Sequence, residues 1–188
     1  MNRLILASGS PRRQELLRKL QLDFDVVVSS IEETFSSNES PEEIVTSLAM
    51  QKAQDVAAKY PDDYVVGADT MVVLENQILG KPKSEQDAFN ILKMLSGNTH
   101  HVLTGVAILH QQQQTIFCEK TEVTFWDLTE QEIHDYILSG EPFDKAGAYG
   151  IQEFGSILVK RVNGDYFSVV GLPVSRTIRE LTMIGYNG

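Results

Sequence analysis

The stretch YVVGADTMVVL, residues 64–74, predicts a buried β-strand. It is rich in β-branched residues and almost continuously apolar. One carboxylate, Asp69, breaks the run, and a buried carboxylate carries a large free-energy cost unless it is paired, protonated or bound to a metal. Asp69 is therefore a candidate functional residue; the alternative is a strand-end aspartate that only accepts backbone hydrogen bonds. Gly67 indicates a bend or the close approach of a ligand.

Apolar runs alternate with helical patterns on both sides of this strand, which indicates an α/β fold with a mixed sheet. The expected strands and hairpins are residues 3–7, 24–28 and 64–74, a hairpin over 101–126, and a second hairpin over 156–170 around Asn163-Gly164. The expected helices are one opened by Pro11, one over about 41–59, one over about 85–95, one capped by Thr129 and ending near Gly140, and a last one over 174–184. No long linker separates these segments, so residues 1–188 are expected to form a single domain.

Composition excludes several classes of protein. The 188 residues include 16 Lys and Arg against 26 Asp and Glu, a formal net charge of −10. That acidic surplus argues against a nucleic-acid polymer as partner. No apolar run has the length of a membrane span and no signal peptide is recognisable, so we expect a cytoplasmic protein without membrane contact. The single Cys118 excludes an internal disulfide framework and a cysteine-based zinc site.

Two positions carry positive charge where local stability does not explain it. Lys52 falls near the centre of the apolar face of the helix expected over residues 41–59. Its ammonium either reaches past the helix to solvent or binds an anion in a cleft. The stretch SGSPRR, residues 8–13, puts two arginines in the first turn of a helix, against the helix dipole. An anion there would be bound by backbone N–H groups, by the hydroxyls of Ser8 and Ser10, and by Arg13 or Arg12.

Weaker features extend this pattern to a phosphate site. Glu32-Glu33 and Lys81 lie in predicted loops, and the small residues of DKAGAYGIQ, residues 144–152, suit a close backbone approach to a ligand. Asp69 with Glu33 or Glu32 would supply carboxylates for Mg²⁺, which usually binds one or two carboxylates together with substrate phosphates. Local positive charge in an acidic protein favours a small anionic ligand.

Five motifs together resemble the Maf family of nucleoside triphosphate pyrophosphatases over essentially the whole chain. They are LASGSPRRQELL at 6–17, GADT at 67–70, GKP at 80–82, LSG at 95–97 and DKAGAYGIQ at 144–152. The resemblance implies an α/β fold related to the inosine triphosphate pyrophosphatases, with a mixed twisted sheet in two lobes around a deep cleft. It also implies hydrolysis of a nucleoside triphosphate to the monophosphate and pyrophosphate, through metal-assisted attack of water on the α-phosphorus.

The resemblance also implies roles for individual residues. Asp69 matches the family's acid/base residue, and the residues that handle phosphate and metal match Ser8, Arg13, Glu33, Lys52 and Lys81. Asp69 and Glu33 are the expected ligands of Mg²⁺ or Mn²⁺, and whether Asp69 is the base or a direct ligand stays open. The positions that separate the subgroups match Arg12, Thr70 and Gln152 and look like the subgroup that acts on dTTP and UTP.

Two rival functions remain. Maf-like proteins are also linked to arrest of cell division, so the chain is alternatively a non-catalytic nucleotide-binding regulator of septum formation. The other rival keeps the chemistry but uses a modified nucleotide such as 7-methyl-GTP, as a house-cleaning enzyme would. The resemblance is compatible with a homodimer, although no apolar stripe in the sequence marks its interface.

Overall fold

A computed structural model describes residues 2–36 and 38–188 of the chain. The domain predicted over 1–188 thus includes Met1 and Ser37, which lie outside the described residues. The chain divides into two compact units. The first contains the residues up to Asp69, Thr104–Glu119 and Gly171–Gly188, and the second contains Thr70–Leu103 and Lys120–Val170.

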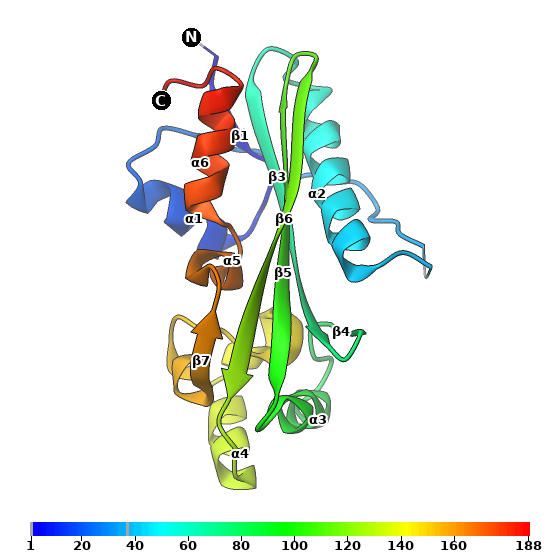
Figure 1. Cartoon of the computed structure of the whole chain (residues 1–188), viewed down its shortest axis with the longest axis vertical. Coiled ribbons are helices and arrows are strands. Elements are labelled where there is room, and N and C mark those ends of the chain that lie inside the picture. The colour runs from blue at the N-terminus through cyan, green and yellow to red at the C-terminus, as the bar shows by residue number, and fades with distance from the viewer. Residues whose placement is uncertain (1, 37) are drawn as a thin grey trace. The chain divides into compact units, whose positions relative to one another are not determined.

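The strands form a mixed sheet in the order β2-β1-β3-β5-β6-β7, with β4 paired to β3 (Figure 1). β1 is parallel to β2 and β3, whereas β4 is antiparallel to β3 and β7 is antiparallel to β6. The predicted mixed α/β fold is therefore confirmed. The strands are β1 (Leu4–Leu6), β2 (Asp25–Val26), β3 (Tyr64–Leu74), β4 (Gln77–Leu79), β5 (Thr99–His110), β6 (Gln113–Phe125) and β7 (Val159–Asn163).

Local capping signals determine where most helices begin. Ser40 and Glu43 form a capping box at the start of α2, and Thr129 and Glu132 form another at the start of α4. Each helix predicted from the sequence is present. The helices are α1 (Pro11–Lys19), α2 (Pro41–Ala57), α3 (Glu85–Leu95), α4 (Glu130–Leu138), α5 (Tyr166–Val170) and α6 (Val174–Met183), with 3₁₀ turns between Glu141 and Leu158.

Helix α2 packs directly on the sheet of the first unit, on the opposite side from α1 and α6 (Figure 1). A Cβ atom at Gly67 of β3 would lie 2.3 Å from the carbonyl oxygen of Ala49, and one at Gly105 of β5 would lie 2.4 Å from that of Val45. Because both residues lack a side chain, the backbone of α2 can pack directly against the strands at these two positions. The sequence interpretation of Gly67 as a bend or a ligand contact is corrected, because the close neighbour is a helix. Small residues continue the contact, in a core of Ile5, Ala7, Ala49, Ala53, Val56, Val65 and Ala107.

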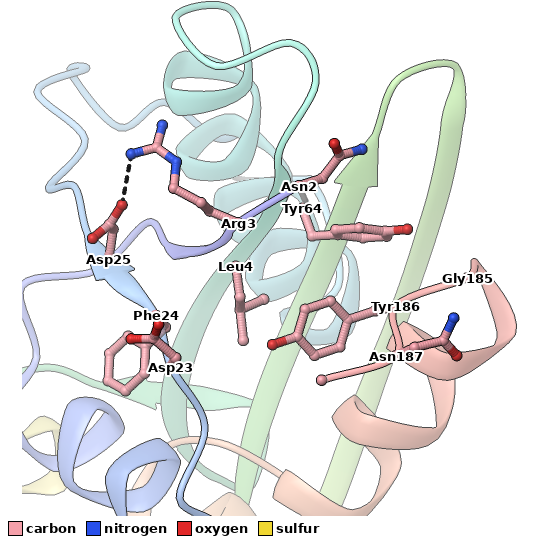
Figure 2. A pocket seen from close by; sticks show the side chains of 11 residues that line it. Asn2, Arg3, Leu4, Asp23, Phe24, Asp25, Tyr64, Gly185, Tyr186 and Asn187 are labelled. Atoms are coloured by element: carbon pink, nitrogen blue, oxygen red, sulfur yellow. Dashed lines mark hydrogen bonds and ion pairs between the residues drawn. The ribbon is translucent and has the colours of Figure 1, made fainter.

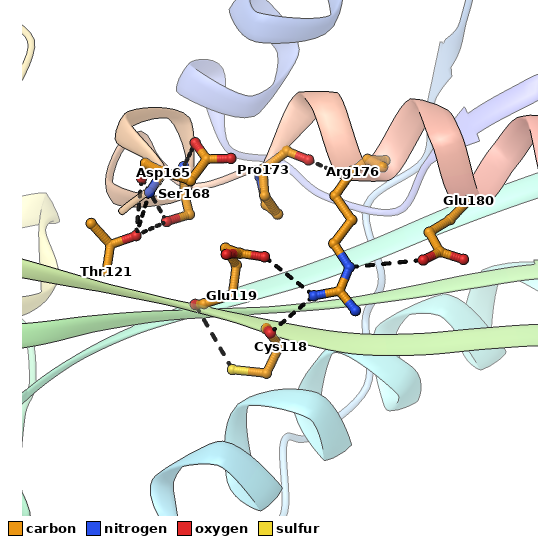
Figure 3. Close-up of polar contacts among 9 residues, drawn as sticks. Cys118, Glu119, Thr121, Asp165, Ser168, Pro173, Arg176 and Glu180 are labelled. Atoms are coloured by element: carbon orange, nitrogen blue, oxygen red, sulfur yellow. Dashed lines mark hydrogen bonds and ion pairs between the residues drawn. The ribbon is translucent and has the colours of Figure 1, made fainter. Parts of the chain in front are cut away.

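Helix α6 is joined to β6 by Arg176 (Figure 3). The guanidinium of Arg176 lies 3.2 Å from a carboxylate oxygen of Glu119 and over the ring of Phe117, 4.3 Å from its centroid. It also lies 3.8 Å from Glu180, one turn further along α6. These contacts fix the C-terminal helix within the first unit.

The hairpin predicted over 156–170 is wrong. β7 pairs with β6, and the chain after Gly164 turns into the short helix α5. Asp165 is the cause, since its side chain accepts a hydrogen bond from the backbone N–H of Phe167 at 2.6 Å. It accepts another from the backbone N–H of Ser168 at 3.1 Å (Figure 3). Buried Thr121 accepts from the Asp165 N–H at 3.0 Å, which anchors this turn to β6.

The second unit has a buried aromatic cluster. His100 is fully buried, and its Nε2 lies 2.8 Å from the hydroxyl of Tyr149, which belongs to the 144–152 motif. Burial lowers the pKa of His100 to about 3 and raises the pKa of Tyr149, so both are uncharged at neutral pH. The rings of His100, Tyr149 and Phe125 meet edge to face, with centroids 4.7–5.4 Å apart. The cluster fixes the middle of the motif to the sheet.

Candidate active site

A lysine lies between two carboxylates in the first unit. The ammonium of Lys52, on α2, lies 2.6 Å from Oδ1 of Asp69 and 2.9 Å from Oε1 of Glu33. The Lys52 and Asp69 side chains are each only 15% exposed, whereas Glu33 is 46% exposed. Lys52 therefore does not reach past the helix to solvent, and Asp69 is a paired carboxylate inside β3. The pairing offsets part of the cost of burying both charges.

Arg13 and Ser8 form a second group in the same unit. Ser10 caps α1 by accepting from the Arg13 N–H, which starts the helix directly after the β1 strand. Arg13 is buried, with 9% of the residue exposed. Its Nη1 donates to the Ser8 hydroxyl at 3.0 Å, and its Nε donates to the Gly171 carbonyl at 2.7 Å. The arginine is therefore held in place from both sides of its guanidinium.

Electrostatics links the two groups. Burial lowers the pKa of Arg13. The negative charge of Asp69 raises this pKa, and the negative charge of Glu33 raises it by a smaller amount. The nearby Arg12, half-buried in the first turn of α1, lowers the pKa of Arg13 further. The two carboxylates therefore offset only part of the effect of burial on the pKa of Arg13.

A cavity of about 170 Å³ lies at this position. Ser8 follows β1, and Val28 and Ser29 follow β2, so the cavity is at the carboxyl ends of parallel strands, where α/β sheets usually bind ligands. Three of the residues singled out from the sequence line it. The lining is Ala7, Ser8, Gly9, Val28, Ser29, Ile31, Glu33 and Lys52.

A larger cavity, of about 420 Å³, lies at the amino end of β1 (Figure 2). Leu4, Phe24, Tyr64 and Tyr186 give it an apolar wall. Its one arginine, Arg3, is already paired with two aspartates. None of the residues predicted to bind substrate or metal lines this cavity. The predicted site residues therefore line the smaller cavity and not the larger one.

The structure brings together Ser8, Arg13, Glu33, Lys52 and Asp69 within the first unit, because Arg13 binds Ser8 and Ser8 lines the same cavity as Glu33 and Lys52. Three other predicted residues belong to the second unit. Thr70 is half-buried in β3, Lys81 is exposed in the loop before α3, and Gln152 is half-buried in a bend of the 144–152 motif.

The bend that contains Gln152 is held by α4 and the turn after it. The Tyr136 hydroxyl accepts from the Gly150 N–H at 3.1 Å, and the Glu141 carboxylate accepts from the Phe154 N–H at 3.0 Å. These bonds lie on either side of Gln152. The backbone that presents Gln152 is therefore fixed within its own unit.

The donor set fits a hard divalent cation that is shared with substrate. Over the described ranges 2–36 and 38–188, no group of three or more His, Cys, Asp or Glu side chains could hold a metal by itself. The carboxylates of Asp69 and Glu33 nonetheless contact one ammonium nitrogen, so both belong to one small site. Two carboxylates suit Mg²⁺ or Mn²⁺ when phosphate oxygens complete the coordination.

Sequence reasoning missed two residues of α2 that contact the loop bearing Glu33. They are Gln51 and Asp55, whose side chains bind backbone groups of Thr34 and Ser30. Their spacing of four residues puts them on one side of the helix, beside Lys52. That spacing is the only signal that the sequence offers, because polar residues on a helix are usually solvated.

The fold and the site define an α/β protein that gathers cations and carboxylates at the ends of parallel strands, as a site for a small anionic ligand requires. The chain belongs to the Maf family: residues 3–184 match the family model described as Maf-like protein. No helix in the described part of the chain combines the length and apolar character needed to cross a membrane.

Curated relatives match nearly the whole chain. A dTTP/UTP pyrophosphatase of Geobacillus sp. (strain WCH70) is 58% identical over 99% of this chain and 100% of its own length. A dTTP/UTP pyrophosphatase of Halalkalibacterium halodurans is 56% identical over 100% of this chain and 98% of its own length. Among solved structures, the Staphylococcus aureus Ham1 protein is similar with a TM-score of 0.50 at 14% identity, covering 67% of this chain and 73% of that one. The last likeness concerns the fold alone.

Proposed function

We propose that this protein hydrolyses nucleoside triphosphates, dTTP and UTP first, to the monophosphate and pyrophosphate. The observation that carries the proposal is the contact of the Lys52 ammonium with both Asp69 and Glu33, beside the buried Arg13. A binding module would need cations for phosphate, but it would not need two carboxylates among them. The names of the relatives at 56–58% identity support the same substrates.

The chemistry assigns a task to each group. A water oxygen forms a bond to the α-phosphorus while the bond to the bridging oxygen of pyrophosphate breaks, so negative charge builds on both sides. Arg13 and Lys52 stabilise that charge, and the predicted role of Lys81 is the same. Asp69 orients the water or accepts its proton. Asp69 and Glu33 would hold Mg²⁺ or Mn²⁺, which when bound supplies further neutralisation of phosphate charge.

Several parts of the proposal go beyond the site in the first unit. We further propose that residues 1–188 act as a single catalytic domain with a nucleoside triphosphate as its small-molecule partner. The homodimer, the cytoplasmic location and the absence of nucleic-acid and membrane partners stay predictions. The rival function as a regulator of septum formation differs from the proposal because it predicts no turnover. The rival substrate, a modified nucleotide, differs from it in nucleotide preference.

Pyrophosphate release tests the reaction. We expect rapid release from dTTP and UTP, and slower release from CTP, ATP, GTP and 7-methyl-GTP, with Mg²⁺ or Mn²⁺ present. Fast turnover of 7-methyl-GTP alone would establish the modified-nucleotide rival. Tight binding of nucleotides to the folded protein with no turnover of any of them would establish the regulator.

Base preference tests Thr70 and Gln152. If these residues read the base, Gln152→Ala and Thr70→Ala will change the ratio of kcat/KM between dTTP and the other nucleotides by about 10-fold, since a lost hydrogen bond is worth about 1–1.5 kcal/mol. The matched control is Glu153→Ala, at the exposed position next to Gln152. An equal loss for every nucleotide would show that neither residue reads the base.

A further inference from the structure

We propose that Gln51 is a positioning residue of the site, which fixes Glu33 by binding the backbone of the next residue, Thr34. The inference rests on the proposed function, in which Glu33 holds the cation. It extends that function to a side chain that acts on the site through Glu33. Three features of the first unit support it.

Glu33 lies in a segment that has no regular structure of its own. Between β2, which has only two residues, and the start of α2, residues 27–36 form neither helix nor strand. Such a segment lacks the backbone ladder that fixes a side chain in a helix or strand. The position of the Glu33 carboxylate, 2.9 Å from the Lys52 ammonium, must therefore be set by contacts from elsewhere.

Gln51 supplies a contact that only a carboxamide can make. Its Nε2 donates to the Thr34 carbonyl at 2.8 Å, and its Oε1 accepts from the Thr34 N–H at 3.2 Å. The side chain thus satisfies both backbone groups of one residue, as a neighbouring strand would. Nε2 also donates to the Ser47 hydroxyl at 3.1 Å, one turn back on α2, which orients the amide. A glutamate has no donor for these contacts.

Asp55 holds the other end of the same segment. Its carboxylate accepts from the Ser30 N–H at 3.1 Å. That backbone donor, followed by the Ser29 hydroxyl, lowers the pKa of Asp55, so the carboxylate remains charged at neutral pH and keeps accepting. Gln51 and Asp55 therefore hold residues 30–34 from one side of α2, and Lys52 on the same helix meets Glu33. One helix carries both the cation of the site and the supports of its carboxylate.

Replacing Gln51 should loosen Glu33 without unfolding the protein. We expect Gln51→Ala to lower kcat/KM for dTTP by about 10-fold, because small displacements of a reacting group are costly in rate. We also expect a several-fold weaker Mn²⁺ affinity, measured by electron paramagnetic resonance. Gln51→Glu keeps the acceptor and loses the donor, so its loss should be comparable. Gln54→Ala is the matched control, since Gln54 is an exposed glutamine on the same helix.

A double-mutant cycle and amide exchange test the mechanism. If Gln51 acts through Glu33, Gln51→Ala will lower kcat/KM in the wild-type background and have no further effect in the Glu33→Ala background. The Thr34 amide should exchange at least 10-fold faster in Gln51→Ala, with the amides of β3 unchanged. Additive losses, or a Thr34 amide that exchanges at the wild-type rate, would overturn the inference. Amide exchange does not require turnover. An inactive wild-type protein would therefore refute the proposed function, and the exchange rate of the Thr34 amide would still test whether Gln51 holds this segment.

Discussion

We expect Asp69→Asn to lower the turnover of dTTP by about 10²-fold or more, which is the usual contribution of an acid/base group to the rate. The substitution keeps the shape of the side chain but removes the charge that pairs with Lys52 at 2.6 Å. It also removes the oxygen that would accept the proton of the attacking water. The measurement is steady-state release of pyrophosphate, with the melting temperature recorded beside it.

The control for this variant is Asp62→Asn, at an exposed turn before β3. It changes the net charge by the same amount without touching the site, so its turnover should equal that of the wild type. An Asp69→Asn protein with wild-type turnover would remove Asp69 from the reaction. A large decrease in melting temperature together with lost turnover would instead show that Asp69 stabilises the fold as the ion-pair partner of Lys52.

We expect Gly67→Ala to destabilise the protein by at least the upper end of the roughly 1–3 kcal/mol that overpacking usually costs. The added Cβ would lie 2.3 Å from the carbonyl oxygen of Ala49 and 2.9 Å from the Cβ of Ala53. Those atoms belong to a helix, which cannot rotate away as the end of a flexible side chain can. Helix α2 must therefore shift, and Lys52 shifts with it. Urea unfolding measures the loss of stability, and pyrophosphate release measures the effect of displacing Lys52.

Gly80→Ala is the control for stability, because a Cβ there meets no atom within 4 Å. Its free energy of unfolding should stay within a few tenths of a kcal/mol of the wild-type value. Equal midpoints for Gly67→Ala and Gly80→Ala would mean that α2 accommodates the methyl group. The close packing inferred for α2 would then be wrong.

Much of the fold was predictable because its signals are local. The strand over 64–74 shows as a run of β-branched residues, and the starts of α2 and α4 show as capping boxes. The hairpin over 156–170 failed because Asp165 ends the strand and caps a helix, which competes with the turn signal of Asn163-Gly164. The short strand β4 was not predicted at all, since three residues are too few for a periodic signal.

The sequence by itself determined which residues are out of place: an aspartate in an apolar strand, a lysine on an apolar helix face and arginines at a helix start. Such conflicts are visible without coordinates because each opposes a local rule. Only the tertiary structure decided what these residues meet. Lys52 contacts Asp69 because α2 packs on β3 at Gly67, and Gln51 supports Glu33 because the loop after β2 passes along α2. Contacts between segments 17 or more residues apart depend on packing, which local pattern does not encode.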